Sequence, residues 1–134
     1  MAPAPQSPEP ASPSVSRDAP RRGSGQGIAV LRVLSASVEP VRAEPGQEVQ
    51  LVVVYTIDGV PPGAEIEVIE SRAVLEDGRH LNTVRAVVRR PSGVHESRQS
   101  LRLPQSLAAG VYELAVEVRA GETRSEGTAI FEVR

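Results

Sequence analysis

Residues 107–118 read Leu-Ala-Ala-Gly-Val-Tyr-Glu-Leu-Ala-Val-Glu-Val, and this stretch carries the clearest indication of the fold. From Tyr112 onward every second side chain is apolar, while the residues between are glutamate or alanine. A period of two is typical of a strand that buries one face and exposes the other. The stretch therefore predicts a half-buried strand that follows a corner at Gly110, with Leu107 reaching the core from that corner.

Tyr112 stands at the start of this strand, two residues after Gly110. The placement resembles the tyrosine corner of Greek-key sandwiches, where a buried ring directs its hydroxyl back to the backbone a few residues upstream. We therefore predict that the Tyr112 ring is buried and that its hydroxyl bonds to backbone within residues 105–110.

Six further apolar segments, separated by turn sequences such as Pro45-Gly46 and Asp77-Gly78, continue the same design. They predict strands at residues 28–38, 48–57, 64–75, 81–90, 94–103 and 123–133. Because no segment has helical periodicity, the seven strands predict an all-β sandwich of two sheets, and a small barrel is the competing architecture.

The third of these segments, residues 64–75, breaks the alternation. Ile66 and Val68 place its apolar face on even positions, whereas later apolar residues fall on odd ones, namely Ile69, Ala73 and Leu75. We interpret the slip as a β-bulge or as a strand that changes sheet.

Acidic residues crowd this same segment and its exit: Glu65, Glu67, Glu70, Glu76 and Asp77. Their alternation along a strand predicts a solvated face, paired with arginines of a neighbouring strand, namely Arg85, Arg89 or Arg90. A calcium site is the alternative, since oxygen-rich clusters hold that ion. We predict the solvated face and no stabilising metal.

Composition divides the chain in two. Residues 1–27 are rich in proline, glycine and serine and have almost nothing to bury, so they predict a disordered tail. Residues 28–134 predict one folded domain. A twin-arginine export signal starting at Arg21-Arg22 is the alternative for the tail, but Arg32 interrupts its apolar stretch. No apolar run approaches the roughly 18 to 20 residues that cross a bilayer.

The charge and the residue types exclude several classes of function. A formal net charge of -2 predicts no nucleic-acid footprint. The absence of cysteine excludes disulfides and thiolate chemistry. All 15 cationic residues are arginine, a bias that we interpret as the coding of a GC-rich bacterial genome.

Side chains with catalytic or binding chemistry are scarce. Neither His80 nor His95 has the spacing of a metal ligand, and no nucleophile elbow or phosphate-binding loop occurs. The aromatic residues Tyr55, Tyr112 and Phe131 are all expected to face the core, which leaves no ring for stacking on sugars or nucleic acid. We predict no catalytic, cofactor-binding or metal-binding residue, no enzyme activity, and no small-molecule ligand.

Two stretches resemble a known family. Residues 44–51, Glu-Pro-Gly-Gln-Glu-Val-Gln-Leu, and residues 107–114 are similar to bacterial immunoglobulin-like modules, including fibronectin type III-like and macroglobulin-like variants. The resemblance covers the chain from Val38 onward. It implies a seven-stranded immunoglobulin-like Greek-key sandwich that lacks the Cys-Trp-Cys core of antibody domains. It also implies a binding, spacer or accessory role, because such sandwiches host many functions.

We therefore expect a non-catalytic module that binds another protein through loops or a sheet edge. A structural spacer without a ligand is the alternative, and a small hydrolase or metal-dependent enzyme has the least support. An exposed apolar patch would favour binding over spacing, whereas a pocket with convergent polar groups would favour an enzyme.

Overall fold

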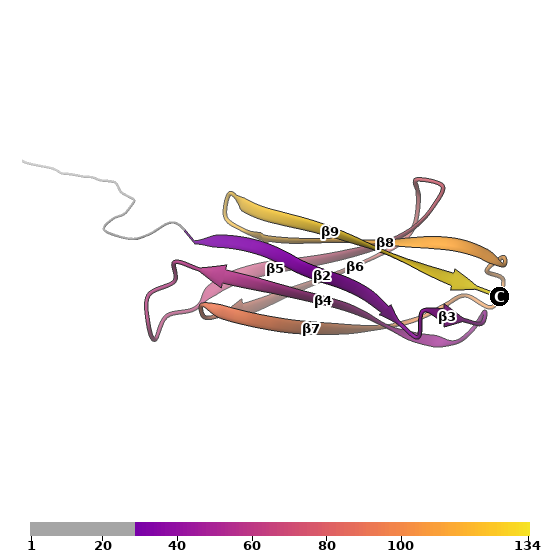
Figure 1. The fold of residues 1–134 in the computed structure, drawn as a ribbon, viewed down its shortest axis with the longest axis horizontal. Helices are drawn as coiled ribbons and strands as arrows, with labels where there is room; N and C mark the ends of the chain where they lie inside the picture. The colour runs from indigo at the N-terminus through magenta and orange to yellow at the C-terminus, as the bar shows by residue number, and fades with distance from the viewer. Residues whose placement is uncertain (1–28) are drawn as a thin grey trace, which may run out of the picture.

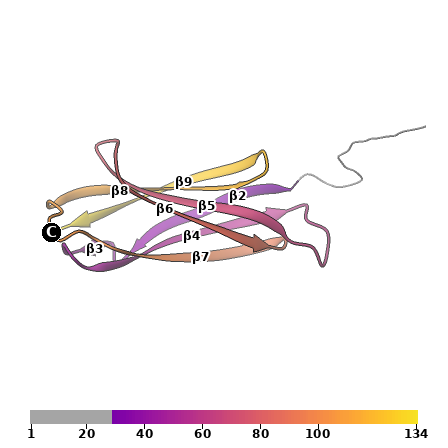
Figure 2. The same cartoon turned by 180° about the vertical axis from the view of Figure 1, so that it is seen from behind.

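The structure, a computed structural model, describes residues 29–134. They form two β-sheets packed face to face, with no helix among them (Figure 1, Figure 2). The strands are β2 (Val30–Glu39), β3 (Arg42–Ala43), β4 (Glu48–Asp58), β5 (Ile66–Glu76), β6 (Arg79–Arg90), β7 (Gly93–Arg102), β8 (Gly110–Ala120) and β9 (Thr123–Val133). The described residues are therefore an all-β sandwich of eight strands, one more than predicted. The predicted tail, residues 1–27, lies outside them.

The strands are divided between a sheet of order β2-β4-β7 and a sheet of order β3-β9-β8-β5-β6. The extra strand, β3, is the short segment that follows Pro40 and pairs in parallel with β9. The Glu132 N–H donates to the Val41 carbonyl at 2.8 Å, and the Arg134 N–H donates to the Ala43 carbonyl at 3.0 Å. Two residues are too few to show an alternation, so the sequence pattern could not reveal this strand.

The tyrosine corner is present as predicted. The Tyr112 side chain is 1% exposed, and its hydroxyl donates to the Ala108 carbonyl at 2.6 Å. The Tyr112 ring stacks on Phe131, with ring centroids 5.7 Å apart. This corner lies at the start of β8, whose neighbours in the five-stranded sheet are β9 and β5.

The core fills the space between the sheets with side chains from alternate strand positions. Apolar residues that are less than 2% exposed come from both sheets: Val49, Leu51, Val53, Tyr55, Ile57, Val68, Leu114, Val118, Phe131 and Val133. Tyr55 of β4, Tyr112 of β8 and Phe131 of β9 are therefore buried as predicted. The alternation is regular in β8 and β9, whereas β4 also buries Val52 on its other face.

The third segment contains a bulge as predicted, but the bulge lies at the end of the segment and not at Ile69, and the strand stays in one sheet. The pairing of β5 with β6 runs in register from Ile66 to Val74 and shifts only at Leu75, beside the hairpin turn. Inward positions of β5 continue through Glu70 and Arg72, which are charged but buried. The apolar set on odd positions belongs to the outer face of the sheet, so β5 does not change sheet.

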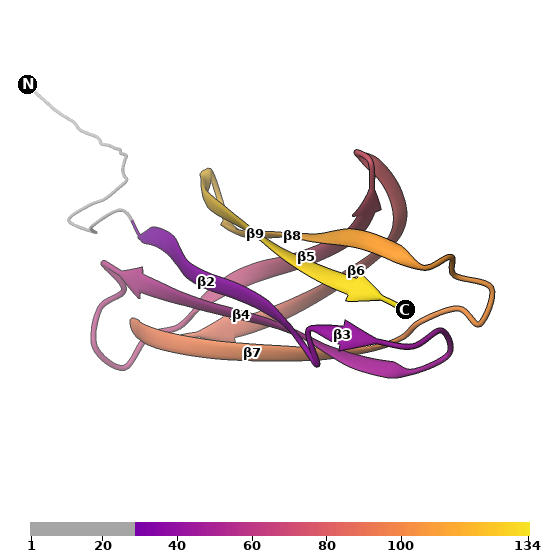
Figure 3. The same ribbon diagram turned by 45° about the vertical axis from the view of Figure 1, so that its right-hand side comes forward.

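The turn between β5 and β6 has the chemistry expected of a two-residue hairpin. Asp77 and Gly78 have φ values of 51° and 77°. Positive φ at both central positions defines a type I′ turn, for which Asp-Gly is a preferred sequence. Figure 3 shows the tip of this hairpin projecting at one end of the sandwich.

Gly127 of β9 lies where β2 approaches the five-stranded sheet. Its replacement tests how tightly the two strands pack. A Cβ atom at position 127 would lie 2.8 Å from Val33 Cγ1, and valine is stiff about χ1. Gly127→Ala is therefore expected to lower the free energy of unfolding by about 1–3 kcal/mol, as overpacked cores do. Urea denaturation measures the change.

A double-mutant cycle separates this clash from a simple loss of glycine. In a Val33→Ala background the methyl group at position 127 has room, so Gly127→Ala should cost less there than in the parent chain. Equal costs in the two backgrounds would contradict the proposed contact.

Candidate functional site

A network of polar side chains lies buried between the two sheets. It joins four strands through Tyr55 of β4, Glu70 and Arg72 of β5, Arg90 of β6, and Ser97 of β7. We call these five residues the buried network. Glu70 and Arg72 are each 1% exposed. Charges so far from water are tolerated only when they are paired and hydrogen-bonded.

The Glu70 carboxylate is the centre of the buried network. One oxygen accepts a hydrogen bond from the Ser97 hydroxyl at 2.6 Å. The other oxygen accepts bonds from the Tyr55 hydroxyl at 2.5 Å and from the Arg90 guanidinium at 3.3 Å. Both carboxylate oxygens are therefore satisfied by side chains from three other strands.

Arg72 connects the same carboxylate to the backbone of the opposite sheet. Its guanidinium lies 3.6 Å from Glu70, and it donates to the carbonyl oxygens of Leu51 at 3.2 Å and Ser97 at 3.0 Å. Because β5 belongs to one sheet and β4 and β7 to the other, these bonds tie the two sheets together on this side of the sandwich.

The surroundings of Glu70 and Tyr55 shift the pKa values of both groups. Burial acts to raise the pKa of Glu70, but the hydrogen bonds from Ser97 and Tyr55 and the charges of Arg90 and Arg72 outweigh it, so the pKa lies below its usual value. Burial, followed by the hydrogen bond to Glu70, raises the pKa of Tyr55 to about 12. Glu70 is thus ionised and Tyr55 neutral around neutral pH.

The pH dependence of stability should carry the signature of Glu70. Because its pKa is lower in the folded protein than the ordinary 4.5, protonation favours the unfolded chain. Its contribution is complete above the ordinary value and is lost as the pH falls through the folded value. Glu70→Gln should therefore flatten the pH dependence of the free energy of unfolding as the pH falls below the ordinary value of 4.5.

Urea titrations at several pH values measure this slope, and Glu65→Gln controls for removing one exposed carboxylate. A Glu70→Gln slope equal to that of the parent chain would show that Glu70 is not the titrating group.

The expectation that all acidic residues of β5 face water is wrong for Glu70. The prediction for Glu70 was wrong because the alternation of residue types along one strand does not show whether a glutamate faces the core or the solvent. The pairing expected with arginines of a neighbouring strand is found at two positions: Glu70 lies 3.3 Å from Arg90, and Glu65 lies 3.9 Å from Arg89.

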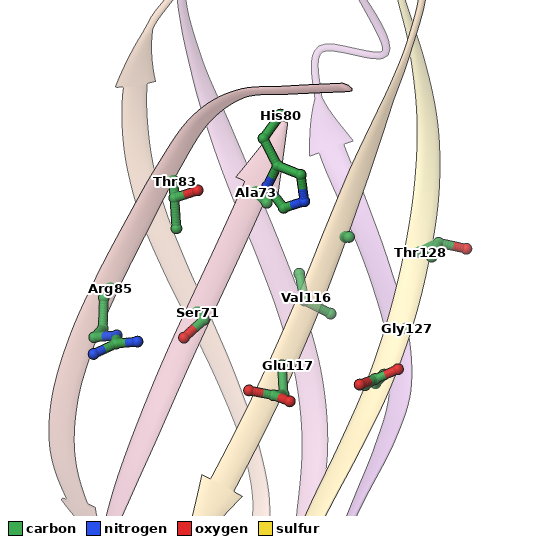
Figure 4. A pocket seen from close by; sticks show the side chains of 11 residues that line it. Ser71, Ala73, His80, Thr83, Arg85, Val116, Glu117, Gly127 and Thr128 are labelled. Carbon is green, nitrogen blue, oxygen red and sulfur yellow. The ribbon is translucent and has the colours of Figure 1, made fainter. Parts of the chain in front are cut away.

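The outer face of the five-stranded sheet carries a hollow of about 350 Å³ (Figure 4). Cross-strand register explains it, because one row across β6, β5, β8 and β9 consists of small side chains: Thr83, Ala73, Ala115 and Thr128. The next row is charged at both sides, with Arg85 on β6 and Glu117 and Glu126 on β8 and β9. The hollow is therefore a shallow surface feature bordered by both signs of charge.

The two histidines lie in different places. His80 lines the hollow beside Ala73 (Figure 4). The Nε2 atom of His95 lies 2.8 Å from the Pro91 carbonyl oxygen, and its ring lies 5.8 Å from the Tyr55 ring. Within residues 29–134, no three His, Asp or Glu side chains are grouped as metal ligands would be. No helix in this range has the length and apolar character needed to cross a membrane.

The edge of the five-stranded sheet at β6 is the feature that sequence reasoning missed. β6 bonds to β5 on one side, and no strand of the described residues bonds to its other side. Its sequence, Arg-His-Leu-Asn-Thr-Val-Arg-Ala-Val-Val-Arg-Arg, holds four arginines and no acidic residue. The sequence does show four arginines and no acidic residue in this segment. Only the order of strands in the sheet shows that the segment is an edge strand.

Comparison with known proteins finds similar folds among solved structures but assigns the chain to no family. No family model and no curated protein matches the sequence. An alkylpurine DNA glycosylase from Pseudomonas fluorescens is similar in structure, with 16% identity and a TM-score of 0.52 over 78% of this chain and 30% of that one. A family 123 glycoside hydrolase from Clostridium perfringens is similar at 12% identity and a TM-score of 0.51, over 78% of this chain and 27% of that one.

An immunoglobulin-like protein from Pseudomonas aeruginosa has 14% identity and a TM-score of 0.42, over 83% of this chain and the whole of that one. The chain thus spans less than a third of the two larger proteins that it matches. At such low identity, the likenesses to the glycosylase and the glycoside hydrolase indicate a shared fold alone, and in both proteins the matching part is a fraction of a longer chain.

Proposed function

We propose that the chain is a non-catalytic, immunoglobulin-like accessory module that binds another protein through the edge strand β6. One observation carries this proposal: β6 runs from Arg79 to Arg90 and is open along its outer edge among the described residues. An exposed edge strand offers unpaired backbone groups to another chain, and proteins that do not use such an edge normally cover it or shorten it.

The other edges of the sandwich are less available. β3 is only two residues long, and β2 lies against β9, where the Val33 N–H donates to the Ser125 hydroxyl at 2.9 Å. The edge strand β7 has its charge neutralised, because Arg98 lies 2.8 Å from both Glu39 and Glu96. Within residues 29–134, β6 is therefore the long edge strand that carries arginines, no acidic residue and an unpaired outer side.

The placement of the shifted ionisable groups supports a non-catalytic role. Tyr55, Glu70 and Arg72 have pKa values displaced by burial and by one another, and all three contact each other or the backbone inside the sandwich. Perturbed groups in an active site face a cleft, where a substrate can reach them. Here they bond the two sheets instead.

A spacer is the second candidate, and one observation favours it. The first described residues enter at one end of the long axis of the sandwich, and the C-terminus leaves at the other end (Figure 1). A module with this layout separates whatever is attached at its two ends. Spacing and binding are compatible, so the decisive question is whether β6 contacts a partner.

Site-specific photocrosslinking in the cells that make the protein tests the proposal. A photoreactive phenylalanine analogue replaces Val87 in the C-terminal half of β6, which is 58% exposed. The matched control replaces Leu34 on the other sheet, which is 49% exposed. We expect position 87, and not position 34, to form a covalent adduct with another protein. If neither position forms an adduct, the binding role is rejected in favour of the spacer.

A further inference from the structure

We infer that the partner contributes an extended acidic segment, which adds to β6 as a sixth strand of the five-stranded sheet. This inference rests on the proposed function and specifies the partner of the same edge. It makes three demands that can be checked separately: free backbone groups along β6, a charge that selects acidic residues, and a side-chain pattern that sets their spacing.

The backbone of β6 meets the first demand. In an antiparallel pair, alternate residues direct both N–H and C=O toward the partner strand, and the residues between direct theirs away from it. β6 pairs with β5 from Arg79 to Arg90, so alternate residues along this length have backbone groups pointing outward. An extended segment that aligns with the edge can bond to these groups without displacing any bond to β5.

The charge of β6 meets the second demand. Arg85 forms no ion pair with any residue of 29–134. Arg89 lies 3.9 Å from the Glu65 carboxylate and donates to the Glu65 carbonyl at 3.1 Å, and both contacts are exposed to solvent. Arg79 is similarly held at 3.8 Å from Glu76. These contacts are weak, since exposed pairs contribute about 0–1 kcal/mol. Arg85 is therefore available to a carboxylate on an added strand, and Arg79 and Arg89 can exchange their exposed contacts for one. Arg90 is held in the buried network by Tyr55 and Glu70.

The spacing of side chains meets the third demand. Register with β5 places Arg85, Val87 and Arg89 on the outer face of the sheet, because their partners Ser71, Ile69 and Glu67 occupy it. On an added strand, the residues facing this row should be acidic, apolar and acidic at successive alternate positions. On the other face, the half-buried row of Val84, Ala86 and Val88 calls for small or apolar residues.

Two other uses of such an edge predict different behaviour. Charged side chains on an edge strand protect a sheet from aggregation, and in that case no ligand binds. Arginines also bind the phosphates of nucleic acids, but a phosphate backbone makes no use of Val87, which stands exposed between two arginines. The exposed valine is the reason to prefer a peptide strand.

The test uses the full chain and a fluorescein-labelled peptide with blocked ends, Ser-Gly-Thr-Glu-Val-Val-Thr-Glu-Thr-Gly-Ser, in a fluorescence anisotropy titration. We expect saturable binding. A control peptide with lysine in place of both glutamates should bind at least about ten-fold more weakly, because like charges then face each other across the strands.

Charge-reversal variants locate the site. Arg85→Glu with Arg89→Glu should weaken binding of the acidic peptide by about ten-fold or more, and should restore binding of the lysine peptide. Arg32→Glu with Arg134→Glu changes the net charge equally at exposed positions away from β6, and it should leave binding within about two-fold of the parent chain. Thermal unfolding confirms that both variants are folded.

N-methylated peptides separate strand addition from simple attraction between charges. Two versions carry N-methyl groups on alternate residues, one version on the odd positions and the other on the even positions. Since only alternate residues donate to the edge, one version should lose binding and the other should keep it. If both versions bind like the unmodified peptide, strand addition is excluded.

Two further results would overturn the inference. If the acidic peptide shows no binding while position 87 crosslinks to a protein, the module binds protein by another mode and only the inference fails. Alternatively, a DNA duplex of mixed sequence might bind more tightly than the peptide and lose binding in the Arg85→Glu, Arg89→Glu variant, in which case β6 is a phosphate-binding strand.

Discussion

Glu70→Ala is expected to lower the free energy of unfolding by about 3–5 kcal/mol, the range measured when one partner of a buried ion pair is removed. The substitution leaves the Arg72 guanidinium buried without its carboxylate, and it also deprives the hydroxyls of Tyr55 and Ser97 of their acceptor. Urea denaturation followed by circular dichroism measures the loss.

Two controls distinguish a buried pair from a general effect of charge. Glu65→Ala removes an exposed carboxylate that lies 3.9 Å from Arg89, and it should cost less than about 1 kcal/mol. The double replacement Glu70→Leu with Arg72→Met removes both fully buried charges together and should cost less than Glu70→Ala alone. The only charge that then lacks Glu70 is Arg90, whose side chain is partly exposed to water. If Glu70→Ala were as mild as Glu65→Ala, the buried network would not hold the sheets together.

Tyr112→Ala is expected to cost a similar amount, about 3–5 kcal/mol, through a different mechanism. The ring is fully buried against Phe131, so truncation empties a core site. Tyr112→Phe keeps the ring and removes only the hydroxyl that donates to the Ala108 carbonyl, so it should cost about 1–3 kcal/mol. Thermal and chemical denaturation of both variants give the order.

Glu113→Ala is the matched control for this pair of substitutions. Glu113 is the next residue of β8 and faces the outer side of the sheet, so its replacement should change stability by less than about 0.5 kcal/mol. A loss at position 113 as large as that at position 112 would contradict the register of β8, from which the positions of β5 and β9 follow.

Part of the candidate site could be predicted from residue types and their spacing along the chain. The absence of cysteine and the scarcity of histidine and aromatic residues directed attention away from an active site and toward surfaces. The sequence also suggested arginines of a neighbouring strand as partners for the acidic residues of β5, and Arg90 with Glu70 is such a pair. It did not indicate that this pair is buried, nor which strand forms the open edge.

The amino-acid sequence by itself predicted the all-β fold, seven of its eight strands and the corner at Tyr112, and it favoured a sandwich over a small barrel. These features follow from the alternation of side chains along single strands and from turn residues such as Asp77-Gly78, which act over a few positions. The tertiary structure alone revealed the burial of Glu70 and Arg72, the short strand β3, and the open edge at β6. Each of these depends on which strands become neighbours across the gap between the sheets or along one sheet, and that adjacency is set by contacts between residues far apart in the chain.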